Sequence, residues 1–393
     1  MEVSNGMKIE RSERIKKLPP YLFVELDKAK RKAREEGRDI IDLGIGDPDI
    51  PTPNFIIDAL TKAARDPKNH RYPLDQGLPE FRKAISAWFM KRYGVSMDPE
   101  TEILPLIGSK EGIAHMPLAF VNPGDAVLVP DPCYPPYKSG TYFAGAETVL
   151  MPLVEKNRFL PDLKAVNHAI LHKVRMIFIN YPNNPTGAVC DKKFFKDVVD
   201  FAKKHNIIVC QDAAYSEMGY DGYKAPSIFE IEGAKDVAIE FHSLSKTFNM
   251  TGWRIGFACG NRELVEGLAK IKSNMDSGVF FAIQWAGVAA LANYDKHIRS
   301  VSRVYEERRD VLVDGLETLG WDVTRPSATF YVWTKVPHRF TSAAFSKALL
   351  EKCDIVATPG NGFGENGEGY VRFALTVDKR RIKEAVERIK KRL

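Results

Sequence analysis

The sequence predicts an α/β fold in which a large domain, built on a mostly parallel central sheet flanked by helices, is joined to a smaller α+β domain. Two observations support this prediction. Between about residues 55 and 290, continuous apolar runs alternate with helical stretches such as 191–205, a pattern typical of parallel strands that are buried on both faces. After about residue 317 the pattern changes to several strand-like runs and two helical stretches, which indicates a second, smaller unit.

The first predicted element along the chain is an amphipathic helix at residues 21–36, ended by Gly37. The next segment, DIIDLGIGDPDIPTP at 39–53, predicts a short strand followed by a loop rich in glycine, proline and aspartate. Five apolar runs then predict strands of the central sheet. They lie at residues 126–130, 175–180, 207–212, 237–242 and 255–260.

A long helix at about 286–317 is expected to link the two domains. Beyond it, strands are expected in WDVTRP, TFYVWTKV, IVATPG and YVRFALT, and helices at about 342–352 and 378–392. The N-terminal segment is expected to pack with this second unit. The predicted boundaries are 51–290 for the large domain, and 1–50 with 291–393 for the small one.

Composition excludes several classes of protein. The chain has 393 residues and a formal charge of +6, which is too modest to indicate nucleic acid as a partner. Its five cysteines form no Cys-x-x-Cys pair and its eight histidines show no ligand spacing, so neither a disulfide framework nor a metal site is expected. The N-terminus is polar and no apolar run approaches the ~20 residues that span a bilayer. The sequence therefore predicts a cytoplasmic protein with no membrane partner.

Polar residues follow three successive strands of the predicted sheet. The segments NYPNNPTG, DAAYSEM and HSLSK come directly after the runs that end near residues 180, 212 and 242. Ligands of parallel sheets bind beyond the carboxyl ends of the strands. We therefore expect these three segments to converge on one pocket.

Lys246 is the residue of this group with the most specific chemistry. A lysine amine forms a Schiff base with an aldehyde, and pyridoxal phosphate uses this reaction. Its neighbours Ser243, Ser245 and Arg254 suit a dianionic phosphate, since arginine presents a planar fork of donors. The plain alternative is a solvated lysine.

A second phosphate-binding element is predicted in LIGSKEG, residues 106–112. A strand-like run ends at Gly108 and a helix begins near Ser109. Free backbone N–H groups and the helix dipole at such a point favour an anion. The same pattern also fits an ordinary serine N-cap.

The other candidates each have a plain alternative. A carboxylate such as Asp212 can pair with a pyridinium nitrogen, or it can cap the next helix. Tyr215 and Asn184 can donate hydrogen bonds to a ring oxygen, although PNNPTG also fits a turn. Tyr134 can stack on a planar ring or pack in the core. Arg372, within the apolar run YVRFAL, either faces solvent or awaits a carboxylate, because burying it unpaired is costly.

Together these segments resemble the class I/II aminotransferases, which are fold-type I pyridoxal-phosphate enzymes. The resemblance covers nearly the whole chain, and the motifs occur in the order of that family. They are GIGDPD, YPLDQGLPEFRKAI, GSKEG, DPCYPPY, NYPNNPTG, DAAYSE, SLSKTFNMTGWRIG and YVRFAL.

The resemblance implies a role for each candidate. Lys246 would be the Schiff-base lysine and proton shuttle, neutral at that step because the cofactor and Arg254 lower its pKa. Asp212 would pair with the pyridine nitrogen, and the substrate carboxylate would bind Arg372 beside the backbone of Gly46. The remaining cofactor contacts would be Tyr215 and Asn184 at the ring oxygen, Tyr134 on the ring, and Ser109, Lys110, Ser243, Ser245, Arg254 and the partner subunit's Tyr72 at the phosphate. The expected enzyme is thus a homodimer with shared active sites, acting by ping-pong transfer between an amino acid and a 2-oxo acid.

Within this family, segments such as LPPYLFVELDKAK, NHRYPLDQG and TPGNGFGENGEGYVR are most similar to the group that acts on LL-2,6-diaminopimelate. That likeness implies amino transfer to 2-oxoglutarate in lysine biosynthesis, with Tyr21 on the substrate. One departure is Ser277-Gly278, where members of the group have Asn-Gly. The alternatives are an aspartate, alanine or broad-specificity aminotransferase and a pyridoxal-phosphate lyase. A regulator is disfavoured because the ~50 residues before GIGDPD are too few for a DNA-binding domain and linker.

Overall fold

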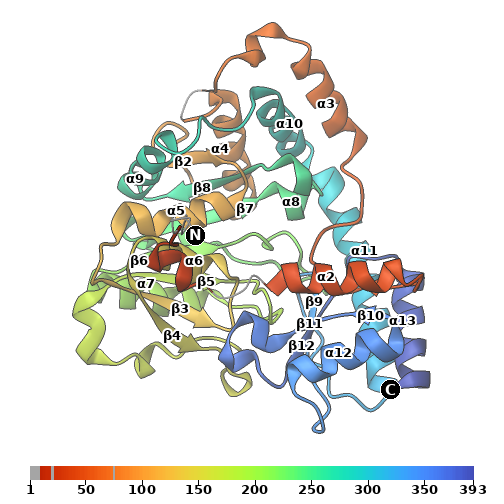
Figure 1. The fold of residues 1–393 in the computed structure, drawn as a ribbon. Coiled ribbons are helices and arrows are strands. Elements are labelled where there is room, and N and C mark those ends of the chain that lie inside the picture. The colour runs from red at the N-terminus through yellow and green to blue at the C-terminus, as the bar shows by residue number, and fades with distance from the viewer. Residues whose placement is uncertain (1–8, 19–21, 74–75) are drawn as a thin grey trace, which may run out of the picture.

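A seven-stranded sheet forms the centre of the molecule. The structure is a computed structural model that describes residues 9–18, 22–73 and 76–393 (Figure 1). In this part of the chain the sheet has the strand order β2-β8-β7-β6-β5-β3-β4. Its strands are β2 (Ile103–Leu106), β3 (Ala126–Asp131), β4 (Glu147–Pro152), β5 (Val174–Asn180), β6 (Ile208–Asp212), β7 (Ala238–Ser243) and β8 (Gly256–Gly260).

The sheet is parallel except at one side. Each pair from β4 through β7 is parallel, whereas β8 is antiparallel to both β7 and β2. The apolar run at 255–260 was expected to form a strand of a parallel sheet. It does form a strand, β8, but that strand runs antiparallel to its neighbours. A parallel return usually runs through a helix that crosses the face of the sheet. Only the short α8 (Leu244–Thr247) and a 3-10 turn lie between β7 and β8, so the chain turns back directly.

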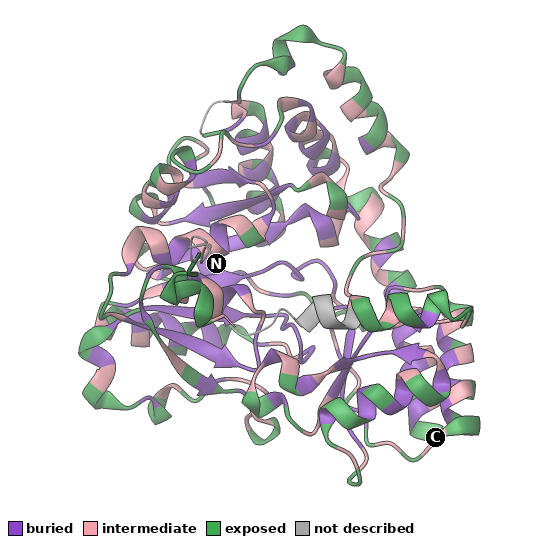
Figure 2. Cartoon of the chain, viewed as in Figure 1, coloured by how far each residue is buried: buried purple, intermediate pink, exposed green. Residues whose placement is uncertain are grey.

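Helices cover both faces of this sheet because both faces are apolar. Buried side chains of α4, α7 and α10 pack on one face, and those of α5, α6 and α9 pack on the other. Figure 2 shows the strands buried between helices whose outer faces are exposed. The helices of this part are α3 (Asn54–Ala64), α4 (Pro79–Tyr93), α5 (Ser109–Phe120), α6 (Pro136–Phe143), α7 (Lys192–His205), α9 (Arg262–Ser273) and α10 (Phe281–Ala292).

A smaller unit surrounds a separate hydrophobic cluster. Its strands make a three-stranded sheet, β11-β12-β9, and a two-stranded one, β1-β10, within the described residues. The pairing of Ile41 with Ile355 joins the N-terminal segment to this unit, as expected. The elements of this unit are α2 (Leu22–Glu35), β1 (Ile41–Asp42), α11 (Tyr294–Thr318), β9 (Tyr331–Lys335), α12 (Ser342–Cys353), β10 (Ile355–Val356), β11 (Thr358–Pro359), β12 (Tyr370–Ala374) and α13 (Lys379–Arg392). The short helix α1 (Glu13–Lys16) precedes α2 in the chain.

Two details of the second half differ from expectation. The predicted helix at 286–317 is two helices, because α10 ends at Ala292 and α11 begins at Tyr294. Between them, the Asn293 side chain donates to the carbonyl of Ala289 (2.9 Å), a local bond that competes with helix continuation. The segment WDVTRP contains no strand.

The domain boundaries at 51–290 stay a prediction, since the cluster of the smaller unit also includes Tyr215.

The remaining regular elements are short. Turns of 3-10 helix occupy Pro67–His70, Glu155–Asn157, Leu163–Ala165, His168–Lys173, Ile228–Glu230, Ala234–Asp236, Thr251–Trp253, Gly360–Phe363 and Glu365–Gly367. Among the described residues, no helix is both long and apolar enough to cross a membrane.

Candidate active site

The segments that follow β5, β6 and β7 do converge on one cavity. It encloses about 320 Å³ at the carboxyl ends of these strands, where the smaller unit closes over the sheet. Twelve of the predicted site residues line it, together with Ile45, Ala214, Thr251 and Tyr331. The twelve are Gly46, Ser109, Lys110, Tyr134, Asn184, Asp212, Tyr215, Ser243, Ser245, Lys246, Arg254 and Arg372.

Lys246 points into this cavity from α8. Its Nζ donates a hydrogen bond to the carbonyl of Gly46 at 3.0 Å. Burial of the amine lowers the pKa of Lys246 from 10.5 to about 8, and the nearby Arg254 and Arg372 act in the same direction. The expected lowering is thus present in the chain itself, with burial as its largest cause. A substantial share of this amine is neutral near pH 8, which a nucleophile requires.

Asp212 ends β6 and is 4% exposed. The hydroxyl of Tyr137 donates to its Oδ2 at 2.8 Å, and the backbone N–H of Ala214 donates to its Oδ1 at 3.1 Å. Burial raises the pKa of Asp212 to about 6, against the effect of these two hydrogen bonds. Above that pH the carboxylate is charged and can pair with a cationic ring nitrogen.

Tyr137 is a residue that the sequence reasoning missed. It lies in DPCYPPY, from which only Tyr134 was selected, and it follows Tyr134 by three positions at the start of α6. Tyr134 lies just before this helix, and the two rings make an edge contact with 5.9 Å between their centres. The ring of Tyr137 stacks on Phe178, with 5.0 Å between ring centres, so its hydroxyl is held toward Asp212.

Asn180, at the end of β5, was also missed. Its amide nitrogen donates to the backbone carbonyl of Asp212 (2.7 Å), and its Oδ1 accepts from the backbone N–H of Asn184 (2.8 Å). It therefore fixes the relative position of two strand ends. The sequence signal available for it was its position, because Asn180 is the polar residue that ends the apolar run 175–180 and begins NYPNNPTG.

The groups predicted to hold a phosphate lie around the N-terminus of α5. Ser109 is the first residue of that helix. Arg254 lies opposite: a Cβ added to Gly108 would come within 2.4 Å of its Nη2. Arg254 itself has φ +54° and donates from Nη1 to the carbonyl of Thr251 at 3.0 Å. A helix N-terminus facing a guanidinium suits a dianion.

Arg372 is buried, so the solvent-facing alternative is wrong. It is 1% exposed on β12, and its Nη1 donates to Oδ1 of Asn184 and its Nη2 to the carbonyl of Gly44, both at 2.8 Å. Two aromatic rings also contact it: the guanidinium carbon is 4.1 Å from the ring centre of Tyr331 and 4.6 Å from that of Phe363. Burial lowers the pKa of Arg372 from its usual value. A planar cation held in this way is suited to a carboxylate ligand.

Tyr215 contacts a third missed residue, Tyr331. Their hydroxyl groups lie 3.0 Å apart, and both side chains are buried. Tyr331 belongs to TFYVWTKV, more than a hundred residues further along the chain, so no local pattern joins it to the site. Its only signal was an aromatic residue at the start of a predicted strand.

Two predicted residues lie apart from these groups. Tyr72 is 85% exposed and does not line the cavity, so its expected role across a dimer stays a prediction. Tyr21 lies outside the described residues. Within the described part of the chain, no group of three or more His, Cys, Asp or Glu residues could hold a metal ion.

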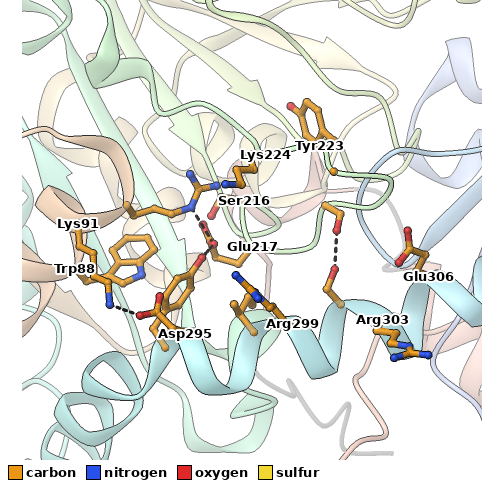
Figure 3. A pocket seen from close by; sticks show the side chains of 16 residues that line it. Trp88, Lys91, Ser216, Glu217, Tyr223, Lys224, Asp295, Arg299, Arg303 and Glu306 are labelled. Atoms are coloured by element: carbon orange, nitrogen blue, oxygen red, sulfur yellow. Dashed lines mark hydrogen bonds and ion pairs between the residues drawn. The ribbon is translucent and has the colours of Figure 1, made fainter.

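A larger cavity of about 940 Å³ lies elsewhere, between the end of α4, the segment after β6 and the first turns of α11 (Figure 3). Its main polar groups already pair with one another. Glu217 accepts from Arg92 Nε at 3.1 Å and from the hydroxyl of Tyr294, and Lys91 pairs with Asp295 (Figure 3). It contains none of the predicted site residues, so its size does not make it the active site.

Comparison with known proteins gives one family for this chain. The family model described as aminotransferase class I and II matches residues 38–389. The LL-diaminopimelate aminotransferase of Moorella thermoacetica is 55% identical over 98% of this chain and 98% of that protein, and the one of Aquifex aeolicus is 54% identical over 97% and 98%.

Solved structures agree with this assignment. The substrate-bound BacF of Bacillus subtilis has a TM-score of 0.95 at 41% identity, covering 98% of each chain. A double mutant of Thermus thermophilus aspartate aminotransferase has a TM-score of 0.90 at 29% identity, covering 97% of this chain and 99% of that one. The resemblance and the fold class predicted from the sequence are confirmed. This chain belongs to the class I and II aminotransferases.

Proposed function

We propose that this aminotransferase moves an amino group between LL-2,6-diaminopimelate and 2-oxoglutarate. The observation that supports the chemistry is the placement of a half-buried lysine amine of lowered pKa, a buried carboxylate and a buried arginine in one cavity. The substrate is proposed from the names of the relatives that are 51–55% identical over nearly the whole chain.

The cofactor is pyridoxal 5'-phosphate, the cofactor of this family. The residues present fit it: an amine for the aldehyde, a carboxylate for the ring nitrogen and a helix N-terminus facing a guanidinium for the phosphate. When bound, the cofactor supplies an electron sink for the bond that breaks at the substrate α-carbon.

We assign the proton transfer to Lys246. With the cofactor bound, the neutral Nζ of Lys246 would take the proton from the substrate α-carbon and return it on the same side of the cavity. The lowered pKa keeps a useful fraction of the amine neutral near pH 8. The carbonyl of Gly46 accepts from Nζ and gives the free amine a resting position.

We assign the other cofactor contacts to the chain's polar and aromatic groups. Asp212 keeps the ring nitrogen protonated, and Tyr134 stacks on the ring. Tyr215 donates to the ring oxygen, and so does Asn184 through its amide nitrogen, because its Oδ1 is occupied by Arg372. The phosphate is bound by Ser109, Lys110, Ser243, Ser245 and Arg254.

The substrate carboxylate is proposed to bind Arg372 in a bidentate pair, beside the backbone of Gly46. Asn184 and the carbonyl of Gly44 hold the guanidinium plane in place before substrate arrives. A group that is already oriented loses little entropy on binding, so this contact favours both affinity and correct placement of the α-carbon.

A homodimer with shared active sites is part of the proposal. Tyr72 is exposed in the single chain and is assigned to the phosphate of the partner's site. Subunits with Tyr72→Phe mixed with subunits with Lys246→Ala should regain activity, because one site of each hybrid then contains neither change. Absence of any regained activity in verified hybrids would contradict a shared site.

We place the enzyme in the cytoplasm, with no nucleic acid or membrane partner. All five cysteines are buried and free, which suits a reducing compartment. We assign Tyr21, outside the described residues, to the substrate.

The second candidate is an aspartate or broad-specificity aminotransferase, favoured by the 0.90 TM-score to aspartate aminotransferase.

The test is to load the purified protein with cofactor and add single amino acids. Loss of the yellow absorbance and formation of pyridoxamine phosphate are followed with LL-diaminopimelate, its meso isomer, aspartate and alanine. We expect the LL isomer to react with a kcat/KM at least about 100-fold above that for aspartate. Comparable rates with aspartate or alanine would favour the second candidate, and elimination products would indicate a lyase.

A further inference from the structure

Tyr331 contacts three parts of the proposed active site at once. Its hydroxyl lies 3.0 Å from that of Tyr215, and its ring centre lies 4.1 Å from the guanidinium carbon of Arg372. It also lies directly against Gly46, where an added Cβ would come within 1.9 Å of the Tyr331 hydroxyl. Tyr331 is 3% exposed and lines the Lys246 cavity.

The backbone fixes Tyr331 in this position. It begins β9 and pairs with Ala374 of β12, the strand that contains Arg372. Its N–H donates to Oγ1 of Thr329 at 3.1 Å, and the N–H of Thr329 donates to the carbonyl of Met218 at 2.9 Å. Tyr331 therefore joins the strand of Arg372 to the segment that contains Tyr215.

We propose that Tyr331 is a positioning residue with two separable parts. Its hydroxyl adjusts the charge on the cofactor ring oxygen through Tyr215, and its ring holds Arg372 ready for the substrate carboxylate. This inference rests on the proposed function, because it takes the cofactor ring oxygen to lie beside Tyr215.

The effect of the hydroxyl follows from the number of hydrogens available. A phenol has one hydrogen to donate. When Tyr215 donates it to the ring oxygen, its own oxygen is left to accept from Tyr331. That second bond polarises the Tyr215 hydroxyl and strengthens its donation. A more strongly bonded ring oxygen is less basic, so the coloured bound cofactor releases its proton at a lower pH.

The effect of the ring is on Arg372. A guanidinium over an aromatic face is stabilised by the negative potential of the ring. The ring centre of Phe363 lies 4.6 Å from the same guanidinium carbon, so Arg372 contacts two aromatic rings. A phenylalanine at position 331 retains this contact and removes the hydroxyl alone, whereas a leucine removes both.

The experiment is a spectroscopic titration of the cofactor-loaded protein without substrate. We expect Tyr331→Phe to raise the midpoint of the colour change by roughly 0.3 pH unit, because the loss of one cooperative hydrogen bond weakens the donation of Tyr215. Tyr215→Phe should raise it further. In the double variant, Tyr331→Phe should add nothing to Tyr215→Phe, because its effect acts through that residue.

A matched control is available in Tyr305. It is fully buried and packs on Phe330, the neighbour of Tyr331, and its hydroxyl has no hydrogen-bond partner among the described residues. Tyr305→Phe removes a hydroxyl from the same aromatic cluster and should leave the midpoint unchanged. For the ring, Tyr331→Leu should raise the KM of the amino donor about fivefold, whereas Tyr331→Phe should keep it within about twofold.

Three results would overturn the inference. They are an unchanged midpoint in Tyr331→Phe, an equal shift in the Tyr215→Phe background, and an equal shift in Tyr305→Phe. A parent protein that takes up no cofactor would overturn the proposed function and this inference together. A protein that shows the expected shift but transfers no amino group would overturn the function and leave this inference standing.

Discussion

The hydroxyl of Tyr137 donates a 2.8 Å hydrogen bond to Oδ2 of Asp212, and both residues are buried. This bond lowers the pKa of Asp212 against the larger, opposite effect of burial. It therefore favours the charged carboxylate, which is the form that pairs with a protonated ring nitrogen. Tyr137 does not line the Lys246 cavity, so we expect it to support the cofactor through Asp212 alone.

Tyr137→Phe should weaken cofactor binding about tenfold, since a hydrogen bond to a charged group is worth roughly 1.5–3 kcal/mol. The pKa of Asp212 should rise above about 6, so the loss should grow as the pH falls from 8 toward 6. Apparent affinity measured by absorbance at several pH values tests both effects. Tyr181→Phe is the control, because that buried hydroxyl donates to the carbonyl of Phe159 instead. Equal effects of the two changes would contradict the prediction.

The lowered pKa of Lys246 predicts how cofactor-free protein takes up the aldehyde. Only the neutral amine attacks, and the neutral fraction rises with pH through the pKa of about 8. The rate constant for recombination with pyridoxal phosphate should therefore reach half its maximum near pH 8. Stopped-flow absorbance between pH 6 and 10 measures it. A midpoint close to 10.5 would mean that the amine is hydrated as in a free lysine.

Arg372→Lys should raise the KM for the amino donor by about 10- to 100-fold, because a lysine lacks the planar fork that pairs with both carboxylate oxygens. Steady-state kinetics with the preferred donor measures the change, and cofactor absorbance should stay as in the parent. Arg309→Lys is the matched control: Arg309 is 2% exposed and binds Asp221 through Nη1 and Nη2. The idea fails if both lysine variants change KM alike.

Asp131 predicts a stability effect at the junction of the two units. This fully buried carboxylate accepts from Lys138 Nζ at 2.8 Å and from the backbone and side chain of Asn366 at 2.9 and 2.7 Å. Asp131→Ala leaves these donors without an acceptor and should cost about 3 kcal/mol, seen as a lower Tm. Because the loop 360–367 also contains Phe363, which packs on Arg372, KM should rise as well.

The control for this change is Asp197→Ala. Asp197 forms an exposed pair with Lys193 on α7, which should be worth no more than about 0.5 kcal/mol. Thermal unfolding of both variants, with cofactor bound, gives the comparison. A similar Tm for the two would show that the Asp131 contacts contribute little.

The sequence was sufficient for the parts of the site that follow strands. Residues such as Asp212 and Lys246 stand at the carboxyl ends of apolar runs, and in a parallel sheet those ends meet. Arg372 could not be placed, because a strand alternates its faces and only the packing decides which face is covered. The antiparallel direction of β8 was equally hidden, since an apolar run has no direction.

The missed residues have a different cause. Tyr331 belongs to the site through a hydroxyl contact to Tyr215, and the two are 116 positions apart. No pattern of period 2 or 3.6 reports a contact across that distance. Tyr137 was within reach, because it lies in the same motif as Tyr134, but a tyrosine in a proline-rich motif has many plain explanations.

The pairing of Ser243 with Gly256 closes residues 244–255 into a loop. Lys246 and Arg254, the proposed covalent and ionic anchors of the cofactor, both belong to it. A cofactor held by both residues would therefore link two points of this one loop, and the link would be lost when the cofactor leaves. Its departure should loosen this loop and leave the hydrogen bonds of the sheet intact. Binding and release of the cofactor should then change only this loop. The rest of the site should stay preformed for the next cofactor molecule.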